Sequence, residues 1–471
     1  MADPLWHWDE LVRVTGGRAE GAAGAITGIS IDTRTLAPGD LFVAIRGDHL
    51  DGHDFVENAF ACGAVGALVG DDYATAAGTP SRPLLRVGDP LAGLGAIARA
   101  ARARTRARVI AVTGSVGKTG TKEALKLCLS ALGRTHAAEK SYNNQWGVPL
   151  TLARTPAGTD YGVYEIGMNH PGEITPLTAM VRPHVALVTN VEAVHLGYFS
   201  SIEEIADAKA EIFAGLEPGG TAILNRDNRF FDRLAGRAHA AGANSVLSFG
   251  EHPEADARLI SLDLGPDGST FEADVMDRRL RCRLGAPGRH VVQNALGVLA
   301  GVAALGGDVT RAAPRLAEMR SPKGRGARTT IETPAGPVLL IDESYNANPA
   351  SMRAALAGIR QVPRASFPRR VVILADMLEL GRDTEQLHRA LLEPVVAAGI
   401  DRVHACGPAM GRLFEVLPDG IKGVYASSAE SLGEELAGEI RAGDVVMAKG
   451  SLASRVGPLV DRLVKNLRAR R

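Results

Sequence analysis

The chain has 471 residues, and at roughly 150 residues per domain this length favours about three domains. Lys plus Arg and Asp plus Glu both number 53, so the formal charge is +0. A dedicated nucleic-acid binder usually carries a basic excess, so this balance disfavours that class. The four cysteines lie far apart, which argues against a zinc knuckle or a disulfide scaffold and favours a reducing, cytoplasmic environment.

A secreted or membrane protein is also disfavoured. The first ten residues, MADPLWHWDE, include acidic residues and no apolar core, unlike a signal peptide. The most apolar long stretch, from Val291 to Gly307, is interrupted by Gln293 and Asn294 and is short of a membrane span. Neither a coiled-coil pattern nor a long apolar surface stretch is evident, so we expect a monomer.

The first predicted domain covers residues 1–105 and is a small mixed α/β unit. Short β-like runs are separated by turn signals such as Pro38-Gly39-Asp40. The expected strands are Ile29–Asp32, Leu41–Ile45 and Ala67–Val69, and the expected helices are Phe55–Ala64 and Leu91–Arg106.

The second predicted domain covers residues 106–318. Apolar runs of four or five residues alternate with helical segments, which is typical of a mostly parallel sheet covered by helices on both faces. Strands are expected at Val109–Val112, Gly162–Ile166, Val185–Thr189 and Ala222–Asn225, and helices at Thr119–Leu132, Ile202–Gly215, Arg229–Ala241 and Val291–Leu305. Between Ala257 and Leu284 the alternation indicates antiparallel hairpins.

The third predicted domain covers residues 319–471 and begins at a loop rich in Pro, Gly and basic residues, SPKGRGAR. Resumed β/α alternation indicates a doubly wound, Rossmann-like domain. Strands are expected at Val338–Asp342, Val371–Ala375, Arg402–Ala405 and Val445–Ala448, and helices at Ser351–Arg360, Thr384–Ala397, Ala429–Arg441 and Val456–Leu467.

The strongest local signal is the stretch VIAVTGSVGKTGTK, from Val109 to Lys122. An apolar strand runs into a glycine-containing turn and then a helix, so main-chain N–H groups from Gly114 to Thr119 can point at an anion near the helix N-terminus. Lys118 supplies a positive charge for phosphates, and the Thr119 hydroxyl is placed to bind Mg²⁺. The pattern predicts a P-loop that binds a nucleotide; the alternative is an accidental glycine turn.

Three polar residues follow later elements of the same domain. Glu165 interrupts an apolar strand. Two interpretations of this carboxylate have about equal weight, a ligand for a hard cation and an ordinary ion-pair partner. His195 follows the strand VALVT. It is either an ordinary loop residue or a residue that acts at the phosphates. Lys209 lies beside the apolar face of its helix, and periodicity alone favours a surface lysine.

Several motifs resemble the Mur ligases, which build the peptide of bacterial cell-wall precursors. In chain order these are TGSVGKT, YEIGMNHPGEI, TNVEAVHLGYF and ADAKAEIF, preceded by SIDTRTLAPGDLFVAIRGDHLDGHDF and followed by DESYNANPASM, ADMLELG and AKGS. The resemblance spans nearly the whole chain. It implies a UDP-sugar-binding first domain, an ATP-binding second domain and a third domain that completes a ligase.

The resemblance further implies the reaction and its reagents. The substrates would be UDP-N-acetylmuramoyl-tripeptide and D-alanyl-D-alanine, with ATP and Mg²⁺. The tripeptide carboxylate would become an acyl phosphate, which the dipeptide amine attacks to form an amide. Phosphate would then leave, as expected of an ADP-forming ligase in peptidoglycan synthesis.

The family's functional residues can be carried over position by position. The implied catalytic residues are Lys118, Glu165, His195 and Lys209, and the implied metal ligands are Thr119, Glu165, His195 and Lys209, with Lys209 carbamylated. ATP would be bound by Thr113, Gly114, Ser115, Val116, Gly117, Lys118, Thr119, Gly120, Asn144, Asn294, Arg325, Asp342 and Tyr345, with Asn143 and His290 in the same stretches. The substrates would be bound by Thr33, Arg34, Arg46, Asp51, His53, Lys449 and Ser451. Val291 and Leu452 stand where the family usually has Asn and Arg.

Two other functions remain open from the sequence. One is another ATP-dependent amide ligase of the same superfamily, such as a folylpolyglutamate or amino-acid-adding enzyme. The other is a P-loop switch, which would bind or hydrolyse nucleotide without forming a bond between two substrates.

Overall fold

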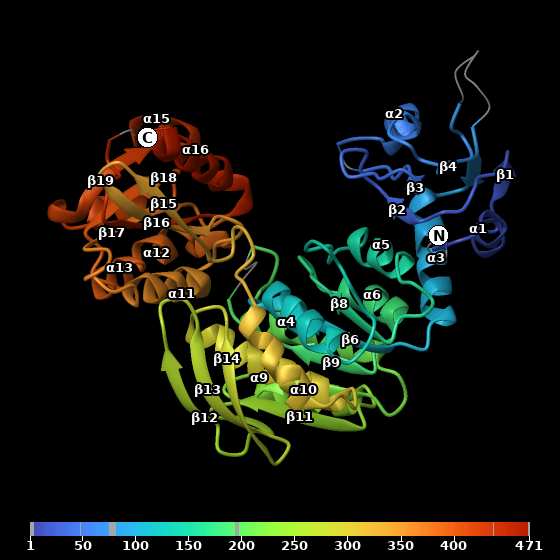
Figure 1. The fold of residues 1–471 in the computed structure, drawn as a ribbon, viewed down its shortest axis with the longest axis horizontal. Helices are drawn as coiled ribbons and strands as arrows, with labels where there is room; N and C mark the ends of the chain where they lie inside the picture. Colours follow the sequence, from blue (N-terminus) through green and yellow to red (C-terminus); the bar gives the residue numbers. More distant parts are fainter. Residues whose placement is uncertain (1–3, 48, 75–81, 194–196, 437, 470–471) are drawn as a thin grey trace.

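The structure is a computed structural model that describes residues 4–47, 49–74, 82–193, 197–436 and 438–469. It contains three β-sheets in chain order, each with helices packed on it (Figure 1). The sheets span residues 18–87, 108–284 and 327–449. The expected domain borders near residues 105 and 319 fall between the sheets, and where each domain ends stays a prediction. No helix of the described ranges is long and apolar enough to cross a membrane.

The first sheet has five strands in the order β1-β5-β4-β3-β2, all parallel except β1. Its strands are β1 (Arg18–Glu20), β2 (Gly28–Ser30), β3 (Asp40–Val43), β4 (Gly66–Gly70) and β5 (Leu84–Val87). Its helices are α1 (Trp8–Thr15), η1 (Gly52–Phe55), α2 (Val56–Ala61) and α3 (Pro90–Arg104). The α3 helix begins sharply because Pro90 follows Asp89, whose carboxylate accepts from the main-chain N–H groups of Leu91 and Ala92.

The central sheet has nine strands in the order β14-β13-β12-β11-β10-β9-β6-β8-β7. Its strands are β6 (Arg108–Thr113), β7 (Thr135–Ala137), β8 (Tyr161–Glu165), β9 (Val185–Val188), β10 (Thr221–Asn225), β11 (Ser245–Gly250), β12 (Ala257–Leu264), β13 (Ser269–Val275) and β14 (Arg278–Leu284). The strands from β7 to β12 are parallel, and β12, β13 and β14 form the expected antiparallel hairpins.

Helices connect the central strands and cover the sheet. They are α4 (Lys118–Ser130), α5 (Gly147–Ala153), α6 (Ile174–Val181), α7 (Ile202–Ala210), η2 (Glu211–Gly215), α8 (Phe231–Ala240), α9 (Arg289–Ala304), α10 (Val309–Ala312) and η3 (Ala313–Glu318). The α4 helix packs beside α9, whereas α5 and α6 contact α3 of the first domain. Strand β6 lies between β8 and β9, so the chain reverses its direction across the sheet there. Open α/β sheets bind ligands at such a switch point.

The third sheet has six strands in the order β15-β16-β20-β17-β18-β19, parallel except for the β15–β16 pair. Its strands are β15 (Ala327–Thr333), β16 (Gly336–Glu343), β17 (Arg369–Ala375), β18 (Arg402–Cys406), β19 (Lys422–Ala426) and β20 (Asp444–Lys449). Its helices are α11 (Pro349–Arg360), η4 (Gly381–Asp383), α12 (Thr384–Arg389), α13 (Leu392–Ala397), α14 (Gly411–Val416), η5 (Asp419–Ile421), α15 (Ala429–Glu435), η6 (Leu452–Ser454) and α16 (Val456–Ala469).

Two predicted helices of this domain were wrong in extent. The single helix expected over Thr384–Ala397 is divided into α12 and α13, because Pro394 has no N–H and is tolerated only in the first turn of a helix. The helix expected over Ala429–Arg441 ends at Glu435. Gly438 has a left-handed φ of 102°, which a continuing α-helix cannot adopt.

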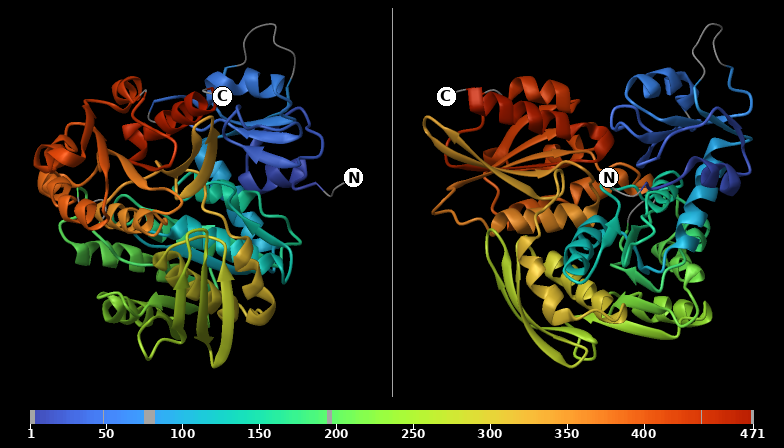
Figure 2. Two further views of the ribbon diagram at one scale, coloured as in Figure 1. Left: turned by 60° about the vertical axis from the view of Figure 1, so that its left-hand side comes forward. Right: turned by 45° about the vertical axis from the view of Figure 1, so that its right-hand side comes forward.

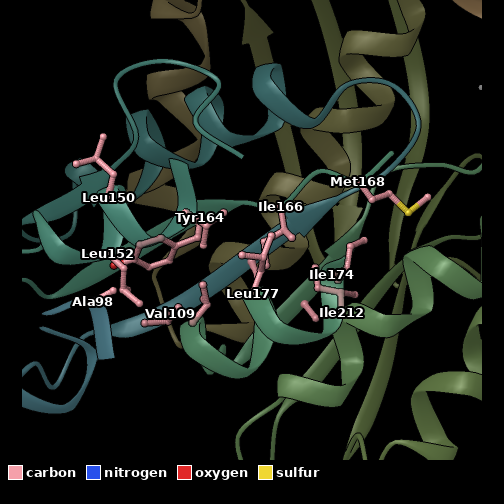
Figure 3. Packing of buried hydrophobic residues seen from close by; sticks show 14 of the residues in the cluster. Ala98, Val109, Leu150, Leu152, Tyr164, Ile166, Met168, Ile174, Leu177 and Ile212 are labelled. Atoms are coloured by element: carbon pink, nitrogen blue, oxygen red, sulfur yellow. The ribbon is translucent and has the colours of Figure 1, made fainter. Parts of the chain in front are cut away.

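The hydrophobic cores show how the domains are joined. One buried cluster contains Trp6 of the first domain together with Val109 and Tyr164 of the central sheet. Figure 3 shows the part of this cluster that includes Val109 and Tyr164. The clusters of the third domain contain residues of that domain alone. The first and third sheets stand on the same side of the central domain, at its two ends (Figures 1 and 2).

Candidate active site

The P-loop lies between β6 and α4 and depends on two glycines with left-handed φ angles. Gly114 has φ 147° and Gly117 has φ 89°, conformations that side chains with a Cβ rarely adopt. A Cβ on Gly114 would overlap the Thr189 hydroxyl, and one on Gly117 would meet the Asn294 side-chain amide. The loop therefore turns tightly against β9 and α9, as the sequence predicts for a strand–turn–helix phosphate site.

Hydrogen bonds from the segment after β9 hold this loop. The main-chain N–H groups of Ser115 and Val116 donate to the carbonyl and side-chain oxygens of Asn190, at 3.0 and 2.9 Å. The Thr189 hydroxyl donates to the Val116 carbonyl at 2.6 Å. The expectation that all N–H groups from Gly114 to Thr119 face an anion is therefore wrong for Ser115 and Val116 in this arrangement.

Lys118 is the first residue of α4, and its Nζ donates to the Gly114 carbonyl oxygen at 2.7 Å. Burial lowers the pKa of Lys118, the nearby Glu165 carboxylate raises it and Arg325 lowers it. The ammonium group is thus folded over the glycine turn, at the place where the P-loop pattern puts the phosphates. Thr113, at the end of β6, is fully buried, and its hydroxyl has no hydrogen-bond partner among the described residues.

Four oxygen-bearing side chains converge beside the loop. The Thr119 hydroxyl lies 3.1 and 3.0 Å from the two Glu165 carboxylate oxygens and 3.0 Å from the Ser141 hydroxyl. The Asn143 side-chain N–H donates to Glu165 at 2.7 Å. Glu165 is 1% exposed, and the hydrogen bonds that it accepts from described residues come from neutral groups.

This cluster fits a magnesium ion. A buried carboxylate is costly unless a cation or hydrogen bonds compensate its charge, and Mg²⁺ prefers hard oxygen ligands such as the Thr119 hydroxyl and the Glu165 carboxylate. Of the other expected metal ligands, His195 lies outside the described residues. No group of three or more His, Cys, Asp or Glu side chains suited to a metal occurs in the part of the chain that the structure describes.

Lys209 is buried rather than at the surface, with 2% of its area exposed. Burial lowers its pKa well below the usual value of 10.5, and the Lys118 ammonium lowers it further. The surface-lysine alternative is therefore excluded. An amine that is readily deprotonated can react with CO₂, so the chemistry of this position is compatible with a carbamate.

The third domain reaches the site through Arg325, between η3 and β15. Its Nη2 donates to the Ser141 hydroxyl at 3.4 Å, and its guanidinium lies 4.0 Å from the centre of the Tyr345 ring. Asp342, at the end of β16, is buried and accepts from the Gly324 main-chain N–H at 3.0 Å and from Ser344. Asp342 thus fixes the loops that carry Arg325 and Tyr345.

Asn294 and Asn144 occupy different environments. Asn294 lies on α9 with its amide against Gly117, so the structure brings it to the P-loop. The Asn144 side-chain oxygen accepts from the main-chain N–H groups of Trp146 and Gly147, at 3.3 and 3.0 Å. Its neighbour Asn143 contacts Glu165 instead. His290 lies at the exposed start of α9.

The residues expected to bind the UDP-sugar form two groups in the first domain. Arg34, beside Thr33, is exposed and pairs with Asp32 at 2.7 Å. Arg46 pairs with Asp51 at 3.1 Å and with Asp72 at 2.7 Å.

His53 is held from both sides of its ring. Its Nδ1 lies 2.5 Å from the Asp51 carboxylate, and its Nε2 accepts from the Gly70 main-chain N–H at 2.9 Å. Nδ1 therefore carries the proton and donates to Asp51. Burial raises the pKa of Asp51, but hydrogen bonds from His53 and Arg46 outweigh it and lower this pKa to about 2.

Lys449 and Ser451 follow β20 in the third domain. Lys449 is 1% exposed, and its Nζ donates to Glu343 at 3.3 Å and to the Asn346 carbonyl at 2.9 Å. The Ser451 hydroxyl accepts from the Leu378 main-chain N–H at 2.9 Å. Both side chains order neighbouring loops at the carboxyl end of the third sheet.

Sequence reasoning did not select Ser141 or Asn190 as site residues. Ser141 contacts both Thr119 and Arg325, and Asn190 accepts from two N–H groups of the P-loop. Ser141 directly precedes the Tyr142-Asn143-Asn144 stretch, and Asn190 lies in the TNVEAVHLGYF motif. Their importance depends on contacts with residues far away in the chain, which local patterns do not reveal.

Comparison with known proteins gives matches along the whole chain. Three family models match: "Mur ligase family, catalytic domain" over residues 25–102, "Mur ligase middle domain" over 112–302 and "Mur ligase, glutamate ligase domain" over 327–452. The UDP-N-acetylmuramoyl-tripeptide–D-alanyl-D-alanine ligase of Escherichia coli (strain K12) is 36% identical over 405 residues, covering 84% of this chain and 85% of that protein.

Solved structures share the fold over nearly the full length. A crystal structure of MurF from Acinetobacter baumannii aligns with a TM-score of 0.83 at 30% identity, over 98% of this chain and 99% of that chain. MurF from Thermotoga maritima in complex with ADP aligns with a TM-score of 0.75 at 24% identity, over 94% and 98% of the two chains.

Proposed function

The chain belongs to the Mur ligase family, and from this premise we propose that it joins D-alanyl-D-alanine to UDP-N-acetylmuramoyl-tripeptide at the expense of ATP. Relatives that align with 92% and 84% of the chain carry this activity in their names, and the three-domain fold matches MurF structures. The observation that carries the proposal is the convergence of the P-loop, Glu165 and Arg325 at the switch point of the central sheet.

We propose that the chain's own residues divide the work as follows. The P-loop and Lys118 hold the phosphates, while Thr119 and Glu165 hold a magnesium ion, which neutralises charge on the transferring phosphoryl group when bound. His195 and Lys209, with Lys209 carbamylated, contribute to a second metal position. Arg325 and Tyr345 bring the third domain against the nucleotide. Positioning of the reactants and exclusion of water then favour attack on the activated carboxyl over hydrolysis.

The first domain is proposed to bind the UDP-sugar through its turn residues, and the third to bind the dipeptide near Lys449 and Ser451. A monomeric state and a cytoplasmic location rest on the sequence arguments and are proposals as well.

A product assay tests the function. Purified protein is incubated with ATP, Mg²⁺, UDP-N-acetylmuramoyl-tripeptide and a panel of amines, and the products are identified by mass spectrometry. We expect an amide with D-alanyl-D-alanine, and phosphate release that needs both substrates. An amide with a different acceptor would favour another ligase of the superfamily, whereas nucleotide hydrolysis without any amide would favour a P-loop switch.

A further inference from the structure

Lys209 lies at a point of the chain that needs an external anchor. It is the second-last residue of α7, and the α-helix passes directly into the 3₁₀-helix η2 at Glu211. Helix ends lack the full set of main-chain hydrogen bonds and fray more readily than helix interiors. A side chain that must hold one position at such a junction therefore depends on contacts made by its neighbours.

Glu211 makes those contacts with the start of α6. One of its carboxylate oxygens accepts from the Gly172 main-chain N–H at 2.6 Å, and the other accepts from the Thr175 main-chain N–H and hydroxyl at 3.1 and 3.0 Å. A carboxylate at a helix N-terminus is also stabilised by the helix dipole. Three hydrogen bonds thus tie the end of α7 to the segment that follows β8.

We call these three hydrogen bonds of Glu211 the clamp. The helices that the clamp joins, η2 and α6, are closely packed. The Thr178 hydroxyl donates to the Ile212 carbonyl at 2.8 Å, and a Cβ on Gly215 would overlap the main chain of Thr178. Ile212 is fully buried in the cluster that contains Ile174 and Leu177 of α6 (Figure 3). The η2 turn is therefore seated on α6, and Glu211 fixes the edge of that contact nearest to Lys209.

The segment that Glu211 holds, around Gly172 and Thr175, is connected along the chain to Glu165. After β8 the chain is bound to the site by the Ile166 N–H, which donates to the Val112 carbonyl at 2.8 Å, and by the Gly167 N–H, which donates to the Asn143 carbonyl at 2.7 Å. The segment from Glu165 to Gly172 is thus held by the site at one end and by Glu211 at the other.

We propose that Glu211 is a positioning residue that sets Lys209 relative to Glu165, and so controls how well the site holds divalent metal with ATP. The inference rests on the proposed function for the identity of the reaction and for the role of Lys209 at a metal position. The hydrogen bonds of Glu211 go to Gly172 and Thr175 rather than to the P-loop, and it acts through the placement of Lys209.

Glu203 offers a matched control. It lies on the same helix, is exposed and carries the same charge, but no hydrogen bond from its side chain is found within the described residues. Glu203→Gln removes one negative charge from α7 without touching the clamp. Glu211→Gln keeps the size of the side chain but turns one acceptor into a donor that faces N–H or O–H groups, and Glu211→Ala removes the clamp entirely.

The experiment measures the Mg²⁺ concentration that gives half-maximal binding of a non-hydrolysable ATP analogue, by calorimetry, and separately kcat and KM for ligation. Groups that orient metal ligands typically cost about 10- to 100-fold in metal affinity when removed. We expect a rise of about that size for Glu211→Ala, a smaller rise for Glu211→Gln, a fall in kcat with little change in KM for the dipeptide, and no rise for Glu203→Gln.

Unchanged Mg²⁺ dependence in either folded Glu211 variant would overturn the proposal, as would an equal shift in Glu203→Gln. If Glu211→Ala does not fold, Glu211→Gln and Thr175→Val, which removes one of the three donors, decide the question by the same measurement. Because nucleotide binding is measured without the acceptor, absence of ligation in the wild-type protein would overturn the proposed function alone.

Discussion

Two glycines lie where the P-loop passes into α4, and replacing each with alanine should change the stability of the protein in opposite directions. Gly117 and Gly120 are three residues apart, on either side of the Lys118-Thr119 pair. In the structure Gly117 precedes α4 with φ 89°, whereas Gly120 lies inside α4, where a Cβ would only make ordinary contact with Met319 at 3.7 Å. Alanine should therefore destabilise at the first position and stabilise at the second.

The magnitudes follow from the backbone. A left-handed conformation costs a residue with a Cβ about 1–2 kcal/mol, and in Gly117→Ala the Asn294 amide must also move away from the new methyl group. Alanine in place of a helical glycine gains about 0.5–1 kcal/mol. If the strain in Gly117→Ala is relieved by distortion of the loop, ATP affinity falls by roughly 5- to 30-fold, since each 1.4 kcal/mol is tenfold.

The assay is calorimetric ATP-analogue binding together with thermal unfolding, in which the transition of the central domain is identified by its shift with nucleotide. We expect Gly117→Ala to bind more weakly and unfold earlier. Gly120→Ala should unfold slightly later with near wild-type binding, because alanine keeps the main-chain N–H through which Gly120 would contact phosphate. Equal behaviour of the two variants, or the reverse order, would refute the assignment of the turn and the helix start.

Three further predictions concern the other parts of the site. Lys209→Ala should nearly abolish ligation without lowering the unfolding temperature, with partial rescue by small carboxylates, and full activity would remove Lys209 from the mechanism. The pKa of Asp51 is lowered from 3.8 to about 2, so the stability that its carboxylate contributes is present above about pH 4 and is lost as the pH falls towards 2. The difference in unfolding free energy between wild type and Asp51→Asn, measured in an acid titration, should therefore shrink between about pH 4 and about pH 2. A difference that stays constant over this window would contradict the assignment. A protein truncated at Arg320 should lose ATP turnover, and turnover equal to that of the full chain would exclude a role of the third domain in closure.

Four parallel strands of the central sheet, β6, β8, β9 and β10, could be predicted because their signals are local, whereas β7 and β11 were not predicted. In β6 and α4 the apolar run, the glycines and the Lys-Thr pair are adjacent in sequence, so pattern and position agree. Helices α1, α5 and α6 were not predicted. They are only seven or eight residues long, and α5 and α6 contain Pro149 and Pro176. Such short segments become helical through packing rather than through propensity.

The candidate site was predicted in part for the same reason. Lys118 and Thr119 lie in one motif, but Glu165 and Lys209 needed the resemblance to be chosen, because a lone carboxylate or lysine has several ordinary explanations. The burial of Lys209 and the contact of Ser141 with Thr119 arise only when separate elements meet. For Asp51 and His53 the structure adds a mutual hydrogen bond that a turn pattern cannot show.

The distribution of the cores indicates which domain can move. The first domain shares a hydrophobic cluster with the central sheet. Separating the two would expose apolar surface to water, at a free-energy cost of about 25 cal/mol for each Å². The third domain meets the central domain through polar contacts such as Arg325 to Ser141 at 3.4 Å and the Gly197 N–H to the Glu379 carbonyl at 3.1 Å. Water can replace such hydrogen bonds at small cost. We therefore expect the first domain to stay fixed on the central domain, and any closing movement over the P-loop to be made by the third domain.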